Sequence, residues 1–413
     1  MTRAVPALVV VTLLALAAPA HAQPSFTIGV GPALESLQPA GGSADSQGAM
    51  AAGGTAEYLF AKERARVFYE LAMSTYATPG DWTSLEHEAG GRYRFDFGAG
   101  DRHHVFTGAS VAMRRNGESW GAADYNAVGT FVNLEFHPSA TSAVRTGYRF
   151  DMRQFPTYSP LDQREHSTFA SWLVNFPTRT TLVTEAAFGA KHYEGTPAAT
   201  ITVATETSPA GSMGSGATGQ GGGQRGTGAH AAGLGSVVFT PVTVPGAPAT
   251  DARQVTLFVR LAQSLAARTG VSLDVGRRNA FGDVPAAVIN TPARFFDDGV
   301  YDDPYASDAT EGRVSLKSIV WGESALTAFA SYQDKPYGAT AALDADGAPI
   351  EGILRHDKVT RAGAGVAVPL APARTGAFDV RLRLGYDFTR HESTTAVYNY
   401  ESHAIGVGFE VGY

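Results

Sequence analysis

Apolar and polar residues alternate one by one along much of the chain, a pattern typical of β-strands whose two faces meet different surroundings. In residues 378–388, the even-numbered positions are apolar or aromatic and the odd-numbered positions are charged or glycine. The same arrangement recurs in four other segments, namely RYRFDF (92–97), VRTGYRFD (144–151), QVTLFVRL (254–261) and VSLDVGRR (271–278). Such strands suit a barrel with lipid outside and a wet lumen inside.

Composition narrows the choice of fold further. Glycine accounts for 47 of 413 residues, and charged residues for only 17%. No stretch after residue 22 approaches 18 consecutive apolar residues, which excludes a helical membrane protein. An open sheet edge has no hydrogen-bond partner in lipid, so the remaining solution is a closed sheet. The sequence therefore predicts an all-β fold, a transmembrane antiparallel up-and-down β-barrel.

Turn residues divide the chain into strands of about 9–11 residues, the length that spans a bilayer. Short connections are predicted at 136–140, 176–180, 266–270, 321–324 and 369–376, and long ones at 153–164, 194–251, 280–308 and 337–354. Short and long connections alternate, as periplasmic turns and extracellular loops do. With strands at 25–31 and 54–62, the count rises from about 14 to about 16, an even number as bacterial barrels require.

One long connection has a composition of its own. Residues 205–233 are rich in glycine and serine and predict a flexible loop. Alternation at 199–206 and 234–239 predicts a hairpin above the membrane, with a second pair of spanning strands as the alternative. Residues 23–413 are thus expected to form a single barrel.

The N-terminal segment predicts export. Residues 1–22 combine Arg3, an apolar run and the sequence Ala20-His21-Ala22, which is typical of a cleavable signal peptide. Cleavage would leave a chain that begins near Gln23, with a formal charge of −7 − 1 = −8. That balance argues against a nucleic-acid partner. The expected location is the outer membrane of a Gram-negative cell.

The last strand carries a candidate assembly signal. In AIGVGFEVGY (404–413), apolar residues alternate up to a final aromatic, with Phe409, Val411 and Tyr413 on one face. Barrel assembly machinery reads such strands by adding them to an exposed sheet edge. The expected partners are therefore this machinery and outer-membrane lipid, while an ordinary terminal strand is the alternative reading. The oligomeric state is left open.

Part of the chain resembles a known family. RLAQSLAARTGVSL (260–273), DDPYASDA (302–309), the WG turn at 321–322 and DKPYG (334–338) are similar to the C-terminal barrels of surface lipoprotein assembly modifier-type proteins. In those proteins a tetratricopeptide domain often precedes the barrel, and its repeats of about 34 residues are absent between the signal peptide and the first strand here. The resemblance therefore implies the barrel alone.

Catalytic and metal-binding motifs are not apparent. The sequence has no cysteine, no G-x-S-x-G and no H-E-x-x-H, so neither an enzyme nor a cofactor or metal site is expected. His103 and His104 point to opposite faces of a strand and are interpreted as solvated residues of the barrel rim. The acidic residues Asp297, Asp298, Asp302 and Asp303 are interpreted as a solvated loop, with calcium binding as the alternative.

The rows that face the lumen suggest a function. Parity assigns to them the arginines Arg92, Arg94, Arg145, Arg149, Arg260, Arg278, Arg313, Arg361, Arg381 and Arg383, together with acids such as Glu70, Asp96, Glu135, Asp151 and Asp274. These charges could favour anions in a pore, or pair across neighbouring strands and stabilise the wall.

Three functions follow from these rows. The leading hypothesis is a porin-like passive channel for small hydrophilic solutes with a weak anion bias. The first alternative is a structural or export-associated barrel with an occluded lumen, similar to that of surface lipoprotein assembly modifiers. The second, a lipid-transport barrel, would need an apolar lumen, which these rows do not show.

Overall fold

The computed structural model describes residues 23–39, 45–60, 64–76, 83–117, 121, 124–157, 159–195, 199–206, 237–244, 249–282, 303–344, 348–370 and 379–412. Almost all of these residues belong to strands. The strands are β1 (Gln23–Pro39), β2 (Asp45–Phe60), β3 (Ala65–Tyr76), β4 (Thr83–Phe97), β5 (His103–Asn116), β6 (Tyr125–Ser139), β7 (Ser142–Gln154), β8 (Gln163–Phe176), β9 (Thr180–Tyr193), β10 (Ala199–Glu206), β11 (Val237–Val244), β12 (Thr250–Ala266), β13 (Thr269–Gly282), β14 (Ala309–Ile319), β15 (Ala325–Leu343), β16 (Pro349–Pro369), β17 (Asp379–Ser393) and β18 (Tyr400–Gly412).

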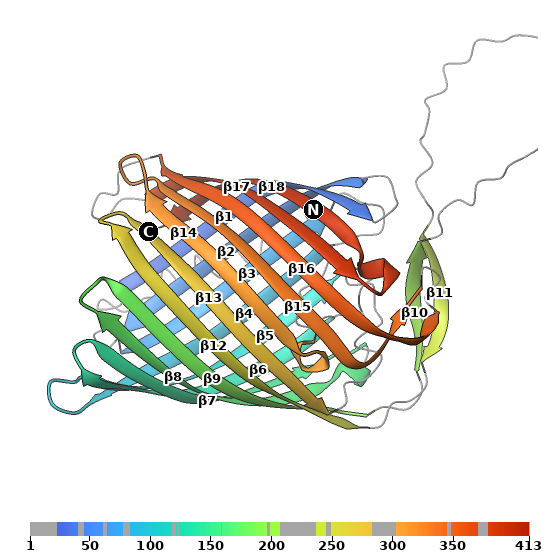
Figure 1. Cartoon of the computed structure of the whole chain (residues 1–413), viewed down its shortest axis with the longest axis horizontal. Coiled ribbons are helices and arrows are strands. Elements are labelled where there is room, and N and C mark those ends of the chain that lie inside the picture. The colour runs from blue at the N-terminus through green and yellow to red at the C-terminus, as the bar shows by residue number, and fades with distance from the viewer. Residues whose placement is uncertain are drawn as a thin grey trace, which may run out of the picture. The chain divides into compact units, whose positions relative to one another are not determined.

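Sixteen of these strands form one closed antiparallel barrel, in the order β1-β18-β17-β16-β15-β14-β13-β12-β9-β8-β7-β6-β5-β4-β3-β2 (Figure 1). The first and last strands close it, with registers from Thr27 opposite Gly412 to Pro39 opposite Tyr400. Closure satisfies the backbone groups that an open edge would leave unpaired. The predicted transmembrane up-and-down barrel is confirmed, with a strand count at the upper end of the predicted range.

The two remaining strands, β10 and β11, pair with each other in a separate compact unit, residues 196–247. Their register runs from Ala199 opposite Val244 to Glu206 opposite Val237. The predicted hairpin therefore forms, although its second strand begins three residues later than the alternation at 234–239 indicated. The predicted flexible loop at 205–233 lies outside the described residues from residue 207 onward.

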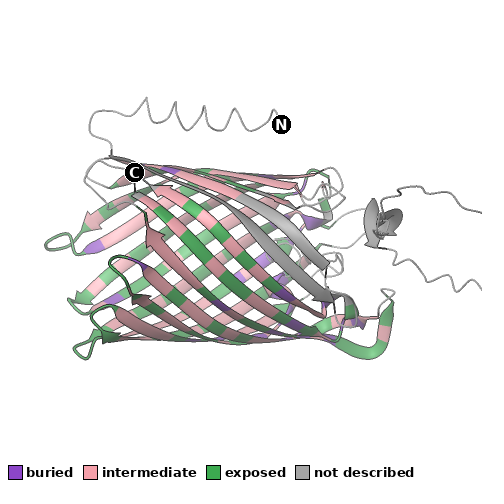
Figure 2. Ribbon diagram, turned by 90° about the horizontal axis from the view of Figure 1, so that it is seen from above, coloured by how far each residue is buried: buried purple, intermediate pink, exposed green. Residues whose placement is uncertain are grey.

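The barrel wall is one sheet thick, so each strand has two exposed faces of different character. Along β6, the burial pattern alternates residue by residue, and Val128, Val132, Leu134 and Phe136 are exposed. Figure 2 shows the same alternation of exposed and intermediate residues along the strands around the barrel. Large apolar side chains are exposed on most of the strands whose side chains are described, which is the arrangement that lipid requires of an outer face.

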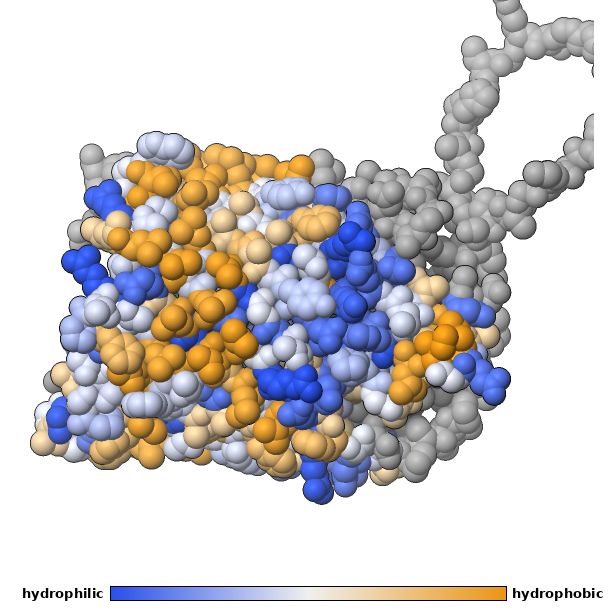
Figure 3. Space-filling view, viewed as in Figure 1, coloured by the Kyte–Doolittle hydropathy of each residue, from blue (hydrophilic) through white to orange (hydrophobic). Residues whose placement is uncertain are grey.

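The apolar side chains gather toward one end of the barrel. In Figure 3 they cover the left and middle of the face in view, and a hydrophilic belt lies to their right. Strands β15 and β16 are 19 and 21 residues long, about twice what a bilayer needs, so their distal parts extend beyond the hydrocarbon layer. Among the described residues, no helix has both the length and the apolar character to cross a membrane.

The connections follow the predicted alternation with one correction. Short turns join β6 to β7, β8 to β9 and β12 to β13, near the predicted positions 136–140, 176–180 and 266–270. The predicted long loop at 337–354 is wrong, because β15 continues to Leu343 and β16 begins at Pro349. Buried contacts among Tyr337, Arg355 and their neighbours hold this hairpin in strand geometry, and local alternation does not reveal such contacts.

Aromatic side chains on the inner face cover glycines of neighbouring strands. A Cβ added to Gly108 would lie 2.6 Å from the backbone oxygen of Gly91 and 2.6 Å from Cε1 of Phe131. Similar contacts place Phe68 over Gly90 and Phe329 over Gly363. Glycine has no side chain to pack in a strand, and here a cross-strand aromatic ring supplies the missing contact.

Replacing Gly108 by alanine should destabilise the barrel by about 1–3 kcal/mol, the usual cost of overpacking a tight site. The measurement is the temperature at which the folded, fast-migrating band disappears on unboiled SDS gels. Gly385→Ala is the matched control, because no atom lies within 4 Å of a Cβ built on Gly385. If the folded band of both variants disappeared at the same temperature, the tight packing at Gly108 would not contribute to stability.

Candidate functional site

All ten predicted lumen arginines lie on the strand face opposite the exposed apolar side chains. On β4, Arg92 and Arg94 alternate with Tyr93 and Phe95, of which Phe95 is 52% exposed. The same parity holds for Arg145 and Arg149 on β7, Arg260 on β12, Arg278 on β13, Arg313 on β14, Arg361 on β16, and Arg381 and Arg383 on β17. This face encloses the interior of the barrel.

A row of polar side chains crosses five neighbouring strands. The residues are direct cross-strand partners in sequence, Arg260, Asp274, Arg313, Ser331 and Arg361. We call this set the β12–β16 row. Because neighbouring strands lie about 4.8 Å apart, Arg313 and Arg361 stand about 10 Å from each other. Three cations and one carboxylate give the row a net charge of +2, counted as 3 − 1.

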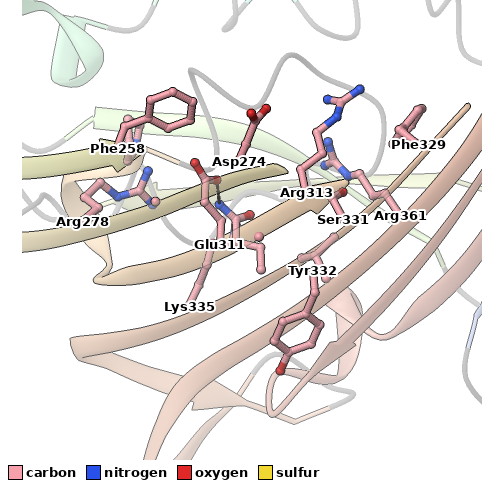
Figure 4. Close-up of a pocket in the computed structure, with 15 residues that line it drawn as sticks. Phe258, Asp274, Arg278, Glu311, Arg313, Phe329, Ser331, Tyr332, Lys335 and Arg361 are labelled. Atoms are coloured by element: carbon pink, nitrogen blue, oxygen red, sulfur yellow. Dashed lines mark hydrogen bonds between the residues drawn. The ribbon is translucent and has the colours of Figure 1, made fainter. Parts of the chain in front are cut away.

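A hollow of about 560 Å³ lies against this row, and its lining adds two further cations, Arg278 and Lys335, and one carboxylate, Glu311. Figure 4 shows Arg313 and Arg361 projecting from one face of the sheet, while the ring of Tyr332 lies on the other. The guanidinium of Arg313 lies 4.2 Å from the centroid of the Phe329 ring, and its Nε donates to Ser315 Oγ at 3.2 Å. These contacts hold the side chain in place and leave its charge uncompensated.

Arg278 is positioned by neutral groups. Its Nε and Nη2 donate to the backbone oxygen and the hydroxyl of Ser307, each at 3.3 Å. Among the described residues, neither Arg278 nor Arg313 has a carboxylate within 4 Å. Their charge is therefore available to a solute.

Other predicted arginines pair with acids instead. Arg94 Nε lies 2.9 Å from Asp96, Arg145 Nε 2.7 Å from Glu135, and Arg260 Nε 2.7 Å from Asp274. Two further pairs are Arg149 with Asp151 and Arg383 with Glu410. Within the described part of the chain, the inner face thus combines arginines that pair within the wall with others that form no ion pair, among them Arg278 and Arg313 beside the hollow.

Two acids that do not pair lie on the opposite side of the barrel. Seven strands separate β4 from β14 in either direction. Glu70 of β3 and Glu88 of β4 are direct cross-strand partners, and within the described part of the chain neither forms an ion pair. Like charges in direct register destabilise a sheet, so this pair lowers the stability of the barrel. The sequence prediction included Glu70 and missed Glu88, although extending the parity of Arg92 would have placed it.

The segment before β14 folds against the inner face. It contains the short 3₁₀ helix η3 (Pro304–Ala306). Lys191 Nζ lies 2.6 Å from Asp303 Oδ2, and both side chains are almost fully buried. The Tyr193 hydroxyl donates to the same carboxylate. The interpretation of Asp303 as part of a solvated acidic loop is therefore wrong, while Asp297, Asp298 and Asp302 lie outside the described residues.

Tyr305 anchors the same segment more deeply. Its hydroxyl donates to Glu165 Oε1 at 2.9 Å. A Cβ added to Gly189 would lie only 2.1 Å from the hydroxyl oxygen of Tyr305. Burial, reinforced by Glu165, raises the pKa of the Tyr305 hydroxyl well above its ordinary value, so it remains a donor. Residues 303–308 therefore narrow the interior, in contact with β8, β9, β12 and β13.

A second buried cluster stabilises the long β15–β16 hairpin. The Arg355 guanidinium lies between the rings of Tyr337 and Tyr398, 4.3 Å and 3.8 Å from their centroids. It also donates through Nη2 to Asp357 Oδ2 at 2.5 Å, and Asp357 is fully buried. Tyr398 belongs to η4 (Ala396–Tyr398), so this cluster joins the β17–β18 connection to the hairpin. Its role is structural.

The candidate assembly residues lie at the end of β18. Phe409 is 54% exposed and shares the outward face with Val407 and Ile405. Val411 continues this face, and Tyr413 lies outside the described residues. The assembly role of these residues stays a prediction.

No protein-family model matches the chain, and no curated protein matches it. Among solved structures, a bacterial polysaccharide outer-membrane secretin is similar at 10% identity and a TM-score of 0.46, over 96% of this chain and 99% of the other. OpdO of Pseudomonas aeruginosa is similar at 8% identity and a TM-score of 0.46, over 95% and 97% of the two chains. OmpT of Vibrio cholerae is similar at 10% identity and a TM-score of 0.41, over 96% of this chain and 99% of the other. Function is therefore inferred from the residues of this chain.

Proposed function

We propose that this chain is a porin-like channel of the Gram-negative outer membrane that passes small hydrophilic solutes and favours anions. A closed barrel of sixteen strands is wide enough for an aqueous path between its walls. The inner face is polar and charged, whereas the outer face is apolar. We assign no catalytic role to any of its residues.

The observation that supports the anion preference is the pair of uncompensated arginines, Arg278 and Arg313, beside the β12–β16 row. Rings or rows of like charge set the selectivity of a pore, because they concentrate counter-ions along the path. The opposite wall holds Glu70 and Glu88, so the electric field points from the arginines to these acids across the lumen, rather than along the barrel axis. Such an arrangement favours anions only weakly, because the acids attract cations to their own side.

The test is ion conductance of the purified protein in planar bilayers. Large, steady current steps are expected, and the reversal potential across a salt gradient should have the sign of anion preference. A silent membrane, obtained with protein that migrates as folded, would contradict the channel. A cation preference would contradict the role given to the arginines.

The second candidate function, a structural or export-associated barrel with an occluded lumen, is favoured by one observation. Residues 303–308 enter the interior and are fixed there by Asp303 and Tyr305. If this segment and its neighbours close the path, the bilayer recordings show no steps, and removing the anchor restores them. The two functions are therefore separated by the same measurement.

The proposed location brings two further expectations. Residues 1–22 would be removed during export, and the outward residues Phe409 and Val411 of β18 would be read by the barrel assembly machinery. Supporting these proposals are the apolar outer face and the pairing of β18 with β1. N-terminal sequencing of the membrane-extracted protein tests the first, with a start near Gln23 expected.

A further inference from the structure

Three potential metal ligands meet on the inner face of β5 and β6. His104 and Glu135 are direct cross-strand partners, and His137 follows Glu135 by two residues on the same face. Each offers one ligand atom, and these three atoms all lie within 4.8 Å of one another. They lie at the rim that carries the short turns, next to the turn between β4 and β5 and the turn between β6 and β7.

We propose that His104, Glu135 and His137 bind a divalent transition-metal ion such as Zn²⁺. Two imidazole nitrogens and one carboxylate oxygen form a donor set that zinc accepts readily, whereas magnesium and calcium prefer oxygen alone. His137 Nε2 already lies 3.1 Å from Glu135 Oε1, close to the spacing of about 3.3 Å between two ligands of a tetrahedral zinc ion. A fourth position remains for water or a solute.

The surroundings of His104 fit this role. Its Nδ1 lies 2.7 Å from Asp96 Oδ1, which directs Nε2 away from the carboxylate and leaves it free for a metal. The Asp96 side chain is only 4% exposed and also forms ion pairs with Arg64 and Arg94, whose Nε atoms each lie 2.9 Å from its oxygens. A carboxylate held in this way orients a metal-binding histidine and strengthens it as a ligand.

Glu135 is oriented from the other side. Its Oε2 accepts from Arg145 Nε at 2.7 Å, so Oε1 faces His137. The ring centroids of His104 and His137 are 5.8 Å apart, and each side chain is partly exposed. Small rotamer shifts therefore suffice to bring three ligands to one ion, and the ion has access from the interior.

The sequence pattern does not reveal this site, because the adjacent residues His103 and His104 point to opposite faces of β5 and only His104 belongs to the group. His103 points outward and is only 8% exposed, with its ring stacked on Phe136 at 4.2 Å. The interpretation of His103 as a solvated rim residue is therefore wrong, and it is not a ligand. The third ligand, His137, comes from the neighbouring strand, so only the register of β5 and β6 brings the group together.

The experiment uses the full chain without a histidine tag, purified in detergent and freed of metal by a chelator. Equilibrium dialysis against Zn²⁺ should give one ion per chain at micromolar concentrations. Substituting Co²⁺ should produce the visible absorption bands of a four-coordinate site, which Zn²⁺ then abolishes. This readout needs no channel activity, so it is independent of the proposed function.

Variants identify the ligands. His137→Gln and His104→Gln should each weaken binding at least tenfold, and Asp96→Asn about 10–100-fold through the orientation of His104. His166→Gln and His403→Gln are the controls, because these histidines point outward and bind Tyr148 and Tyr386, and they should bind metal as the parent does. Parent-like binding by the His104→Gln/His137→Gln double variant, or no saturable binding by the folded parent, would overturn the proposal.

Discussion

Replacing Arg278, Arg313 and Arg361 together by glutamate is expected to turn the preference of the channel from anions to cations. A unit charge about 10 Å from an ion in water contributes about 0.4 kcal/mol, and three reversals change six charges. The unscreened effect is thus about 2.5 kcal/mol, which salt at 0.1 M reduces to about 1 kcal/mol per ion. The interaction energies of anions and cations with the wall change in opposite directions, so the ratio of anion to cation permeability should change on the order of tenfold.

The measurement is the reversal potential across a salt gradient, recorded for the parent and the variant. Arg277→Glu is the matched control, because Arg277 lies next to Arg278 on β13 and points to the outer face. The control should keep the parental sign. A triple variant that still favours anions would show that these three residues do not set selectivity, whatever the conductance of the pore.

The second large effect is expected from the anchor of the inward segment. Asp303→Ala would leave Lys191, whose side chain is 3% exposed, without its carboxylate. Removing one partner of a buried ion pair costs about 3–5 kcal/mol, which should detach residues 303–308 from the wall. The interior then widens, and the single-channel conductance should rise, with more current noise.

A readout independent of conduction is available because the chain has no cysteine. Ser307 is 1% exposed, so a Ser307→Cys thiol should react slowly with a water-soluble maleimide in the parent background and quickly beside Asp303→Ala. The variant Lys191→Met/Asp303→Leu, which replaces the pair by apolar side chains, should restore slow labelling. Asp251→Ala is the control, since its side chain is 68% exposed. Equal labelling rates throughout would show that the ion pair does not anchor the segment.

The barrel could be predicted because its cause is local. Residues such as Tyr93 and Phe95 alternate with Arg92 and Arg94, and a strand turns successive side chains to opposite faces whatever its neighbours are. Turn residues divide these strands, and lipid requires that the sheet close. The number of strands follows from the turn residues and from closure of the sheet. The face on which each arginine lies follows from alternation along its strand. The prediction failed at 337–354, where the Arg355 cluster extends two strands beyond the bilayer.

The sequence by itself determined the two faces of the wall, because alternation with period two needs only neighbouring residues. Only the tertiary structure decided what the inner face presents. Register across strands places Arg313 between Asp274 and Ser331, opposes Glu70 to Glu88, and assembles His104 with Glu135 and His137. Chain folding after β13 buries Asp303 on Lys191. The contact of Lys191 with Asp303 joins residues 112 positions apart, and no local pattern encodes such contacts because they form only when the sheet closes.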